Sequence, residues 1–308
     1  MVFKKIKQKN KKVKKGRIRI IALFLFLSGI ILISSSAYLY YQSRRVPDLR
    51  EEHQMTMLPP DVEKVLGGKT GPKVTPENSI RVPIFMYHYI EYVVDKNDTM
   101  RRKLAITPDV LTSQIETLKE AGYTFINPTD LTLALEKKKT LPQKTIMLTF
   151  DDGYMDFYTN VFPILEKEKV KGTVYVIPDF LDRPNFMFTF QLKEVAKSPY
   201  VEVGAHTMDH LWLKGLDLKK TQYEVTQSRL SLQKTLNLPI ESFAYPYGAF
   251  DQQTIDIVKS AGFTNAMAVI PGVMQSEENK YFLYRLRPGY RSGKTLLDYL
   301  SQNSFKPW

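Results

Sequence analysis

The chain has 308 residues, no cysteine and a formal net charge of +12. The lack of cysteine excludes disulfides, thiolate catalysis and Cys-ligated zinc. Residues 1–19 hold ten lysines or arginines and no acid, so the remaining 289 residues carry a net charge of only about +2. A near-neutral domain gives no reason to expect a nucleic-acid partner, and a hydrophobic fraction of 43% is enough for one large domain or two small ones.

The basic N-terminus precedes a long apolar run. Residues 20–41, "IIALFLFLSGIILISSSAYLYY", contain no charged side chain and are long enough to span a bilayer. The positive flank predicts a cytoplasmic tail at 1–19, a single transmembrane helix at 20–41 and an extracellular remainder, as in a bacterial membrane protein. A cleaved signal peptide, with Ser35-Ser36-Ala37 as its small-residue site, is the alternative. Both alternatives export the domain.

Residues 42–80 are polar and rich in glycine and proline, as in "LPPDVEKVLGGKTGPKVTPENS". Such a composition predicts a stalk with little fixed structure. We expect the folded domain to occupy residues 81–308.

From Arg81 onward, apolar runs alternate with helical patterns. Seven runs read as strands: "RVPIFMYHYI", "YTFIN", "TIMLTF", "GTVYVI", "VEVGAH", "SFAYP" and "NAMAVI". The helical stretches between them include "TPDVLTSQIETLKEAG", "DLTLALEKKK", "FYTNVFPILEKEKV", "DLKKTQYEVTQSRLSLQKTLNLP" and "DQQTIDIVKSAG". This alternation predicts an α/β fold with a parallel sheet, and seven strands favour closure into a (β/α) barrel.

Two of the helical stretches show a clear apolar face. In "TPDVLTSQIETLKEAG", helical spacing places on one face Val110, Leu111, Ile115 and Leu118. In "DLKKTQYEVTQSRLSLQKTLNLP", it places on one face Leu218, Val225, Leu232 and Leu236.

Residues able to do chemistry follow several of the predicted strands. Asp151 and Asp152 follow "TIMLTF", His206 and His210 follow "VEVGA", and His88 follows "PIFMY". The chain has four histidines in all, the fourth being His53 in the predicted stalk, and "FAYPYG" (243–248) ends a further strand. Because the carboxyl ends of parallel strands meet at one edge, we expect these groups to converge.

His206 and His210 are four residues apart, so a helical turn would project both imidazoles to one side. With one carboxylate they form a two-histidine, one-carboxylate set of the kind that holds a divalent cation with open positions. The side chains of consecutive aspartates diverge, so we expect one to bind metal and the other to act as a base. Taken singly, each motif also has a structural explanation. Histidines at a strand end are more often structural than ligands, and two adjacent aspartates alone do not indicate a site.

The motifs "TFDDGY", "HTMDH" and "FAYPYG", in this order, resemble the polysaccharide deacetylases of carbohydrate esterase family 4, the NodB-homology group. The resemblance covers about residues 81–295. It implies a distorted (β/α) barrel that uses a divalent metal, zinc or else cobalt, manganese or nickel, to remove acetyl groups from glycans. It also implies roles for five residues: Asp151 as catalytic base, Asp152, His206 and His210 as metal ligands, and Tyr247 as the donor of a backbone N–H to the oxyanion hole.

The chain departs from that family's pattern at two points. Ala244 stands where an arginine often contacts the base, and no histidine follows His210 to serve as general acid. His88, in "MYHYI", resembles the acid of a branch that includes poly-N-acetylglucosamine and cell-wall deacetylases. A strand-end histidine bonded to a backbone carbonyl is the alternative. Arg285 or Arg287 could replace the missing arginine, or be an ordinary surface charge.

The function implied is a membrane-anchored, extracellular, metal-dependent deacetylase of N-acetylglucosamine-type residues in cell-wall or exported glycans. Trp212 and Tyr154 are candidates for a sugar-binding groove, or else core residues. The main alternative is a catalytically silent carbohydrate-binding module of the same fold. A phosphoesterase would require a larger ligand set or a second metal, and a nuclease does not suit the near-neutral domain.

Overall fold

The computed structural model describes residues 78–302, which lie within one compact unit. The predicted cytoplasmic tail, transmembrane helix and nearly all of the predicted stalk, with the alternative cleavage site, lie outside the described residues. Within residues 78–302, none of the helices is both long and apolar enough to cross a bilayer.

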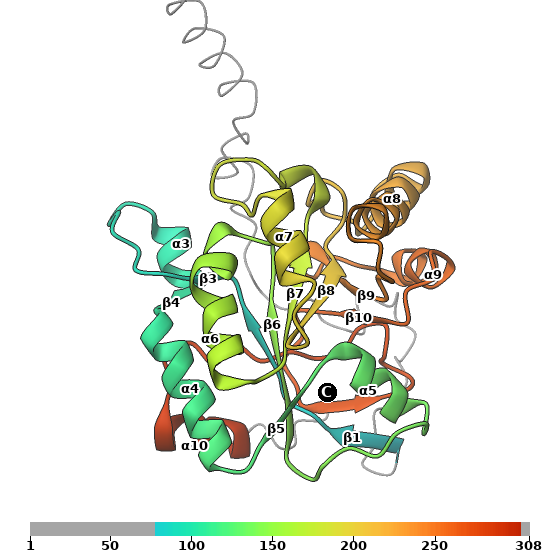
Figure 1. Cartoon of the computed structure of the whole chain (residues 1–308). Coiled ribbons are helices and arrows are strands. Elements are labelled where there is room, and N and C mark those ends of the chain that lie inside the picture. Colours follow the sequence, from blue (N-terminus) through green and yellow to red (C-terminus); the bar gives the residue numbers. More distant parts are fainter. Residues whose placement is uncertain (1–77, 303–308) are drawn as a thin grey trace, which may run out of the picture. The chain divides into compact units, whose positions relative to one another are not determined.

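A seven-stranded parallel sheet forms the centre of the domain (Figure 1). Its strands lie in the order β10-β9-β8-β7-β6-β2, and β5 also pairs with β6. The strands are β2 (Ile84–Tyr87), β5 (Thr124–Ile126), β6 (Thr145–Phe150), β7 (Gly172–Val176), β8 (Val201–Ala205), β9 (Ser242–Ala244) and β10 (Asn265–Met267). All seven lie within the runs that the sequence predicts, so the α/β fold and the parallel sheet are confirmed.

Two small sheets add to this one. The antiparallel pair is β1 (Ser79–Arg81) with β11 (Met274–Ser276), and the parallel pair is β3 (Tyr89–Ile90) with β4 (Ala105–Ile106). Strand β1 includes two residues that the sequence assigns to the end of the stalk. Strand β3 follows β2 after His88 alone, so the first strand continues past the edge of the main sheet.

The segment 283–286 connects the two outer strands of the curled sheet. Leu283 bridges Met267 of β10, and Leu286 bridges Phe85 of β2. The Leu286 N–H donates to the Ile84 carbonyl at 2.7 Å, and the Leu283 N–H donates to the Ala266 carbonyl at 2.8 Å. This irregular segment thus lies where an eighth strand would complete the ring.

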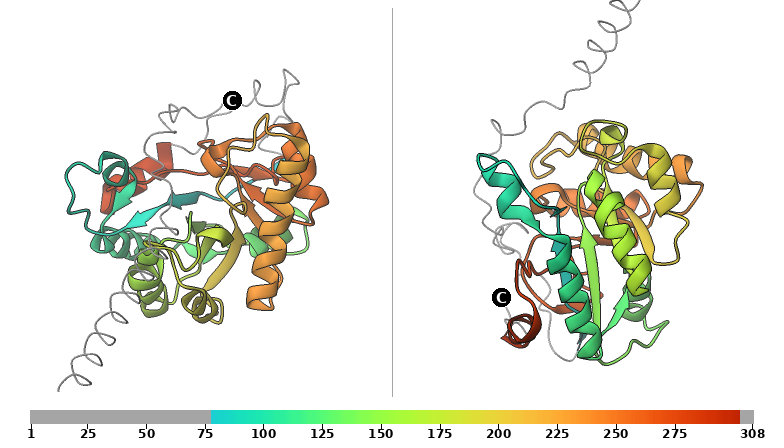
Figure 2. Two further views of the ribbon diagram at one scale, coloured as in Figure 1. Left: turned by 90° about the horizontal axis from the view of Figure 1, so that it is seen from above. Right: turned by 60° about the vertical axis from the view of Figure 1, so that its left-hand side comes forward.

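Helices surround the sheet, as the views in Figures 1 and 2 show. They are α3 (Thr99–Leu104), α4 (Pro108–Glu120), α5 (Pro128–Leu135), α6 (Phe162–Glu168), α7 (Thr189–Val195), α8 (Leu218–Leu236), α9 (Gln252–Ser260) and α10 (Gly293–Gln302), with a π-helical turn at Phe157–Val161 before α6. Several begin at side-chain caps. Thr107, Asp217 and Asp251 each accept a hydrogen bond from a backbone N–H in the first turn of their helices.

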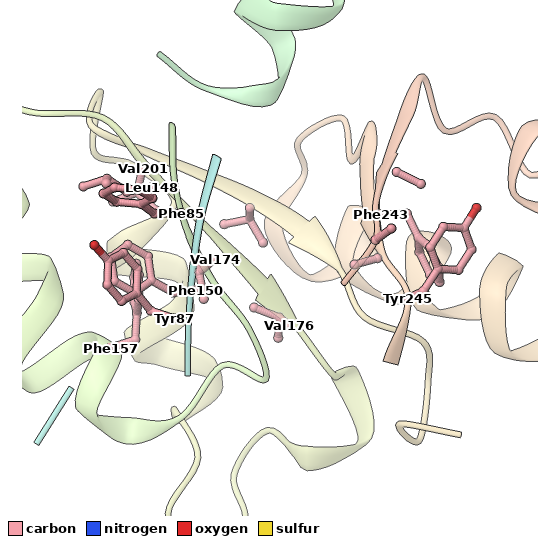
Figure 3. Packing of buried hydrophobic residues seen from close by; sticks show 14 of the residues in the cluster. Phe85, Tyr87, Leu148, Phe150, Phe157, Val174, Val176, Val201, Phe243 and Tyr245 are labelled. Carbon is pink, nitrogen blue, oxygen red and sulfur yellow. The ribbon is translucent and has the colours of Figure 1, made fainter. Parts of the chain in front are cut away.

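The larger core cluster lies between the sheet and these helices, and a smaller one, which includes Ile84, Met147 and Met267, is formed by alternate residues on the other face of the strands. Figure 3 shows Tyr87, Phe150 and Phe157 packed together, with ring centroids 5.1 Å apart for the first pair and 5.3 Å for the second. Each such ring or leucine that is fully buried contributes about 1.5–3 kcal/mol through removal of apolar surface from water. The strands therefore have a well-packed support under their carboxyl ends.

The predicted helix faces are correct with one exception. Leu111, Ile115 and Leu118 are buried, as are Val225 and Leu232. Leu218, however, is 47% exposed, so its assignment to the buried face is wrong. As the first residue of α8 it lies before the turn at which the helix meets the sheet, where Thr221 and Glu224 are buried instead.

Candidate functional site

Asp151 and Asp152 follow β6 directly and are both buried. The Asp151 N–H donates to the Tyr87 carbonyl at 3.0 Å, which keeps this residue in the plane of the sheet beside β2. Asp152 has a φ of +76°, in the left-handed region. Because the backbone conformation changes between these two neighbours, their carboxylates lie in different surroundings. The predicted divergence of the two side chains is therefore correct.

Arg285 binds Asp151 through two parallel hydrogen bonds. Its Nη1 and Nη2 donate to Asp151 Oδ1 and Oδ2, each at 2.8 Å, and its Nε donates to the Ala268 carbonyl at 2.8 Å. Arg285 is only 1% exposed, so its interpretation as a surface charge is wrong. Burial raises the pKa of Asp151, but Arg285 and His206 outweigh it and hold that pKa below its usual range. Arg287, two residues on, is exposed.

The second carboxylate faces two imidazoles. Asp152 Oδ1 lies 3.3 Å from His206 Nε2 and 3.2 Å from His210 Nε2. One ligand atom from each of the three residues lies within 4.8 Å of the others, a group compact enough to hold a metal ion. The three residues that the sequence predicts as ligands are therefore brought together.

Each histidine is oriented through its other nitrogen. His206 Nδ1 lies 2.7 Å from the Ala244 carbonyl oxygen, and His210 Nδ1 lies 2.9 Å from the Tyr247 hydroxyl. A carbonyl only accepts, so His206 Nδ1 carries a proton and Nε2 is left to bind a cation. Such outer contacts fix ring orientation in metal sites. Ala244 thus orients His206 through its backbone carbonyl. The contact with Asp151 that the family's arginine would make from this position comes from Arg285 instead.

The helical turn expected for "HTMDH" is absent. Residues 206–210 form a loop, and Thr207 and His210 have φ values of +62° and +56°. The two rings nevertheless converge, with centroids 4.9 Å apart. The prediction of convergence is correct for a wrong reason, because two left-handed residues replace the helix.

The electrostatics of this group fit a divalent cation. When His206 is neutral and carries its proton on Nδ1, the lone pair of its Nε2 points at Asp152 Oδ1. The negative carboxylate oxygen and this lone pair repel each other. That buried oxygen has no hydrogen-bond partner among the described residues. Burial of an unsatisfied carboxylate oxygen is costly, and a cation would convert the three donors into ligands in the usual two-histidine, one-carboxylate pattern.

His88 lies between β2 and β3, next to the same two carboxylates. Burial lowers its pKa, Asp152 and Asp151 act to raise it, and Arg287 and Arg285 act to lower it further. Within residues 78–302 no hydrogen bond to the His88 ring is found, so the alternative of a bond to a backbone carbonyl finds no support there. In the free protein the lowered pKa favours the neutral imidazole at pH 7.

Tyr247 lies between the second histidine and an exposed indole. Its φ of +60° is uncommon for a residue other than glycine. Its ring contacts His210 at 4.6 Å and stacks on Trp212 at 6.0 Å, between centroids. Trp212 is 37% exposed, whereas Tyr154 is partly buried and stacks on Tyr89 at 4.1 Å. The contact of the Tyr247 side chain with His210 is a feature that the sequence did not reveal.

Comparison with known proteins shows which proteins this chain is similar to. Residues 138–266 match the family model of the polysaccharide deacetylases. The provisionally named polysaccharide deacetylase YxkH of Bacillus subtilis is 26% identical over 68% of this chain and 72% of its own. The poly-beta-1,6-N-acetyl-D-glucosamine N-deacetylase of Staphylococcus aureus is 24% identical over 67% of this chain and 75% of its own. The structure of the deacetylase PplD of Streptococcus pyogenes, in complex with acetate, has a TM-score of 0.66 and 27% identity over 74% of this chain and the whole of PplD.

Proposed function

We propose that this chain is a polysaccharide deacetylase that hydrolyses the acetamide of N-acetylglucosamine residues within a glycan. The observation that carries the proposal is the pairing of two adjacent carboxylates in different environments. Asp151 is ionised against Arg285, and Asp152 faces two histidines in an arrangement suited to a divalent ion. A base beside a metal group is an arrangement that can activate water for amide hydrolysis.

In this proposal, Asp152, His206 and His210 hold the metal. A divalent cation there would polarise the acetyl carbonyl and make water acidic enough to attack at neutral pH. Asp151 accepts a proton from the attacking water. Arg285 keeps this carboxylate ionised and oriented, because both of its oxygens receive a hydrogen bond and a guanidinium lies opposite.

His88 donates a proton to the departing nitrogen. The C–N bond then breaks, water supplies the hydroxyl of acetate, and the sugar keeps a free amine. The donor must be an imidazolium, while burial lowers its pKa in the free protein. The rate should therefore fall as pH rises through the pKa of His88. We assign the backbone N–H of Tyr247 to the developing oxyanion, where a single donor is worth about 3–4 kcal/mol.

The substrate class follows from the relatives and from Trp212. Of the relatives, the Staphylococcus aureus enzyme is named for a poly-N-acetylglucosamine substrate, which supports an N-acetylated glycan here. Trp212 presents an exposed ring beside Tyr247, and aromatic faces suit the apolar faces of sugars. A membrane anchor at residues 20–41 with the domain outside the cell would place such an enzyme beside wall or exported polymers. Zinc is the metal we expect, with cobalt, manganese and nickel as substitutes.

The silent binding module is the weaker alternative. Two features favour it: Ala244 stands where the family often has an arginine, and no histidine follows His210. Arg285 now makes the contact with Asp151 from another part of the chain. A module that only bound sugar would have no use for a buried, ionised carboxylate held in this way.

Acetate release from short N-acetylglucosamine oligomers and from purified cell wall tests the proposal. The purified full-length chain would be assayed with zinc, with a chelator, and as His88→Ala. Release that the chelator and the substitution both abolish is the expected result. Release that survives His88→Ala would remove the acid from the first strand but keep the enzyme. No release, together with glycan binding, would establish the silent module instead.

A further inference from the structure

A buried acid on α8 contacts the loop that carries the two histidines. Glu224 is 0% exposed and lies on the face of α8 that packs into the domain, together with Thr221, Val225 and Leu232. A glutamate is almost never fully buried unless it is paired. At this position of the helical repeat, an apolar residue would pack without any such cost.

The partners of Glu224 explain its burial. Its Oε2 accepts hydrogen bonds from the Met208 N–H at 3.0 Å and from the Asp209 N–H at 2.9 Å. Lys220, one turn earlier on the helix, places Nζ 3.2 Å from the other oxygen, Oε1, which forms an ion pair with it but no hydrogen bond among the described residues. One carboxylate oxygen therefore binds two consecutive peptide groups, and both lie between His206 and His210.

This loop needs external support. Thr207 and His210 are both left-handed, and such conformations cost on the order of 1–3 kcal/mol each for residues other than glycine. His206 is held independently, since its N–H donates to the Val176 carbonyl at 3.0 Å and its ring contacts the Ala244 carbonyl. His210 has only the Tyr247 hydroxyl as a ring partner among the described hydrogen bonds.

We infer that Glu224 is a positioning residue for the metal centre: it fixes the 207–210 loop so that His210 Nε2 faces Asp152. It touches neither the metal nor the substrate and acts through the backbone of Met208 and Asp209. The inference rests on the metal centre proposed above. Loss of such an outer contact typically lowers metal affinity by about 10- to 100-fold.

Three substitutions at this position separate geometry from charge. Glu224→Met removes the acceptor and fills the space. Glu224→Gln removes the charge but keeps one carbonyl oxygen, which is enough because both hydrogen bonds use the same oxygen. Glu224→Asp keeps the charge but shortens the side chain, so it cannot reach both amides. Ser228→Ala, one turn further along the same buried face, is the matched control.

The measurements are zinc affinity of the full-length chain by chelator competition and the visible spectrum of the cobalt-loaded chain, with denaturant unfolding of the metal-free chain alongside. We expect Glu224→Met to lower zinc affinity about 10-fold or more and to change the cobalt spectrum. Glu224→Gln should stay close to the wild type, Glu224→Asp should be clearly weaker than Glu224→Gln, and Ser228→Ala should bind normally.

Three results would overturn the inference. Wild-type affinity and spectrum in Glu224→Met would reduce Glu224 to a structural role, whatever its effect on unfolding. If Glu224→Met does not fold, the order of the other two variants decides: tighter binding by Glu224→Asp than by Glu224→Gln would show that charge matters and position does not. Absence of metal binding by the wild type would refute the metal centre itself, and the inference with it.

Discussion

The stretch from Asp151 to Asp156 contains three buried carboxylates in three different environments. Asp151 is neutralised by Arg285, Asp152 faces His206 and His210, and the Asp156 side chain accepts a hydrogen bond from the Ile90 N–H. Their pKa values accordingly differ: those of the first two are lowered, while burial raises that of Asp156 to about 7. Neighbours in sequence thus acquire separate tasks from their partners alone.

The contrast between the first two carboxylates predicts the largest effect. Asp151→Asn should lower turnover by about 10²–10⁴-fold, because the base is lost, while zinc affinity is retained. Asp152→Asn should lose zinc, and turnover with it. Turnover assays together with chelator competition measure both. If Asp151→Asn lost zinc, or if Asp152→Asn kept it, the two roles would have to be exchanged.

The second largest expected effect is a loss of folding stability on removal of Arg285. Arg285→Met leaves a buried, uncompensated carboxylate, which typically costs about 3–5 kcal/mol. The lowered pKa of Asp151 contributes stability above the pKa of the unfolded state, and that contribution is lost as pH falls. The variant should therefore lose less stability than the wild type on acidification. Denaturant unfolding at pH 7 and at about pH 3, below the unfolded-state pKa, tests this.

Arg102→Met is the matched control, since this arginine is exposed and its guanidinium donates only to the Lys96 carbonyl among the described hydrogen bonds. Its unfolding free energy should change by less than about 1 kcal/mol. Equal losses in the two variants would mean that the Arg285–Asp151 pair is not specifically responsible.

Asp156 should show the opposite pH dependence to Asp151. Its raised pKa means that the folded state holds a proton that the unfolded state has already released, so stability falls as pH rises from about 4 to 7. Glu91 raises this pKa further, and Arg101 and the Ile90 N–H act against it. Asp156→Asn should therefore be more stable than the wild type at pH 8 but not at pH 5, by a few kcal/mol at most. A difference that does not depend on pH would contradict the raised pKa.

The smallest effect belongs to the exposed aromatic beside the site. Trp212→Ala should raise KM for oligomers about 2- to 10-fold and leave kcat nearly unchanged, because it removes a surface for sugar stacking. Tyr223→Ala, an exposed aromatic on α8, is the control. A fall in kcat alone would point to Trp212 acting through Tyr247 rather than on the sugar.

The sequence predicted the strands from local patterns, and the convergence of Asp152, His206 and His210 from the topology of a parallel sheet. Buried parallel strands read as apolar runs, and their carboxyl ends meet by topology. Arg285 could not be assigned, because its contact with Asp151 depends on how the irregular segment 283–286 joins both outer strands. The burial of Glu224 could not be predicted, since a polar residue within an amphipathic helix normally faces solvent. The left-handed conformations of Thr207 and His210 could not be predicted either, because neither residue is a glycine.

The joining segment has a consequence for the order of folding. Arg285 and Asp151 are 134 positions apart in the chain, and the segment that carries the arginine is the last to join the ring of strands along the sequence. A chain that ends or pauses before residue 283 has all the predicted strands but leaves Asp151 buried without its counter-charge. Such long-range contacts form late and slowly. We therefore expect the Arg285–Asp151 pair to form only after segment 283–286 has joined β2 and β10.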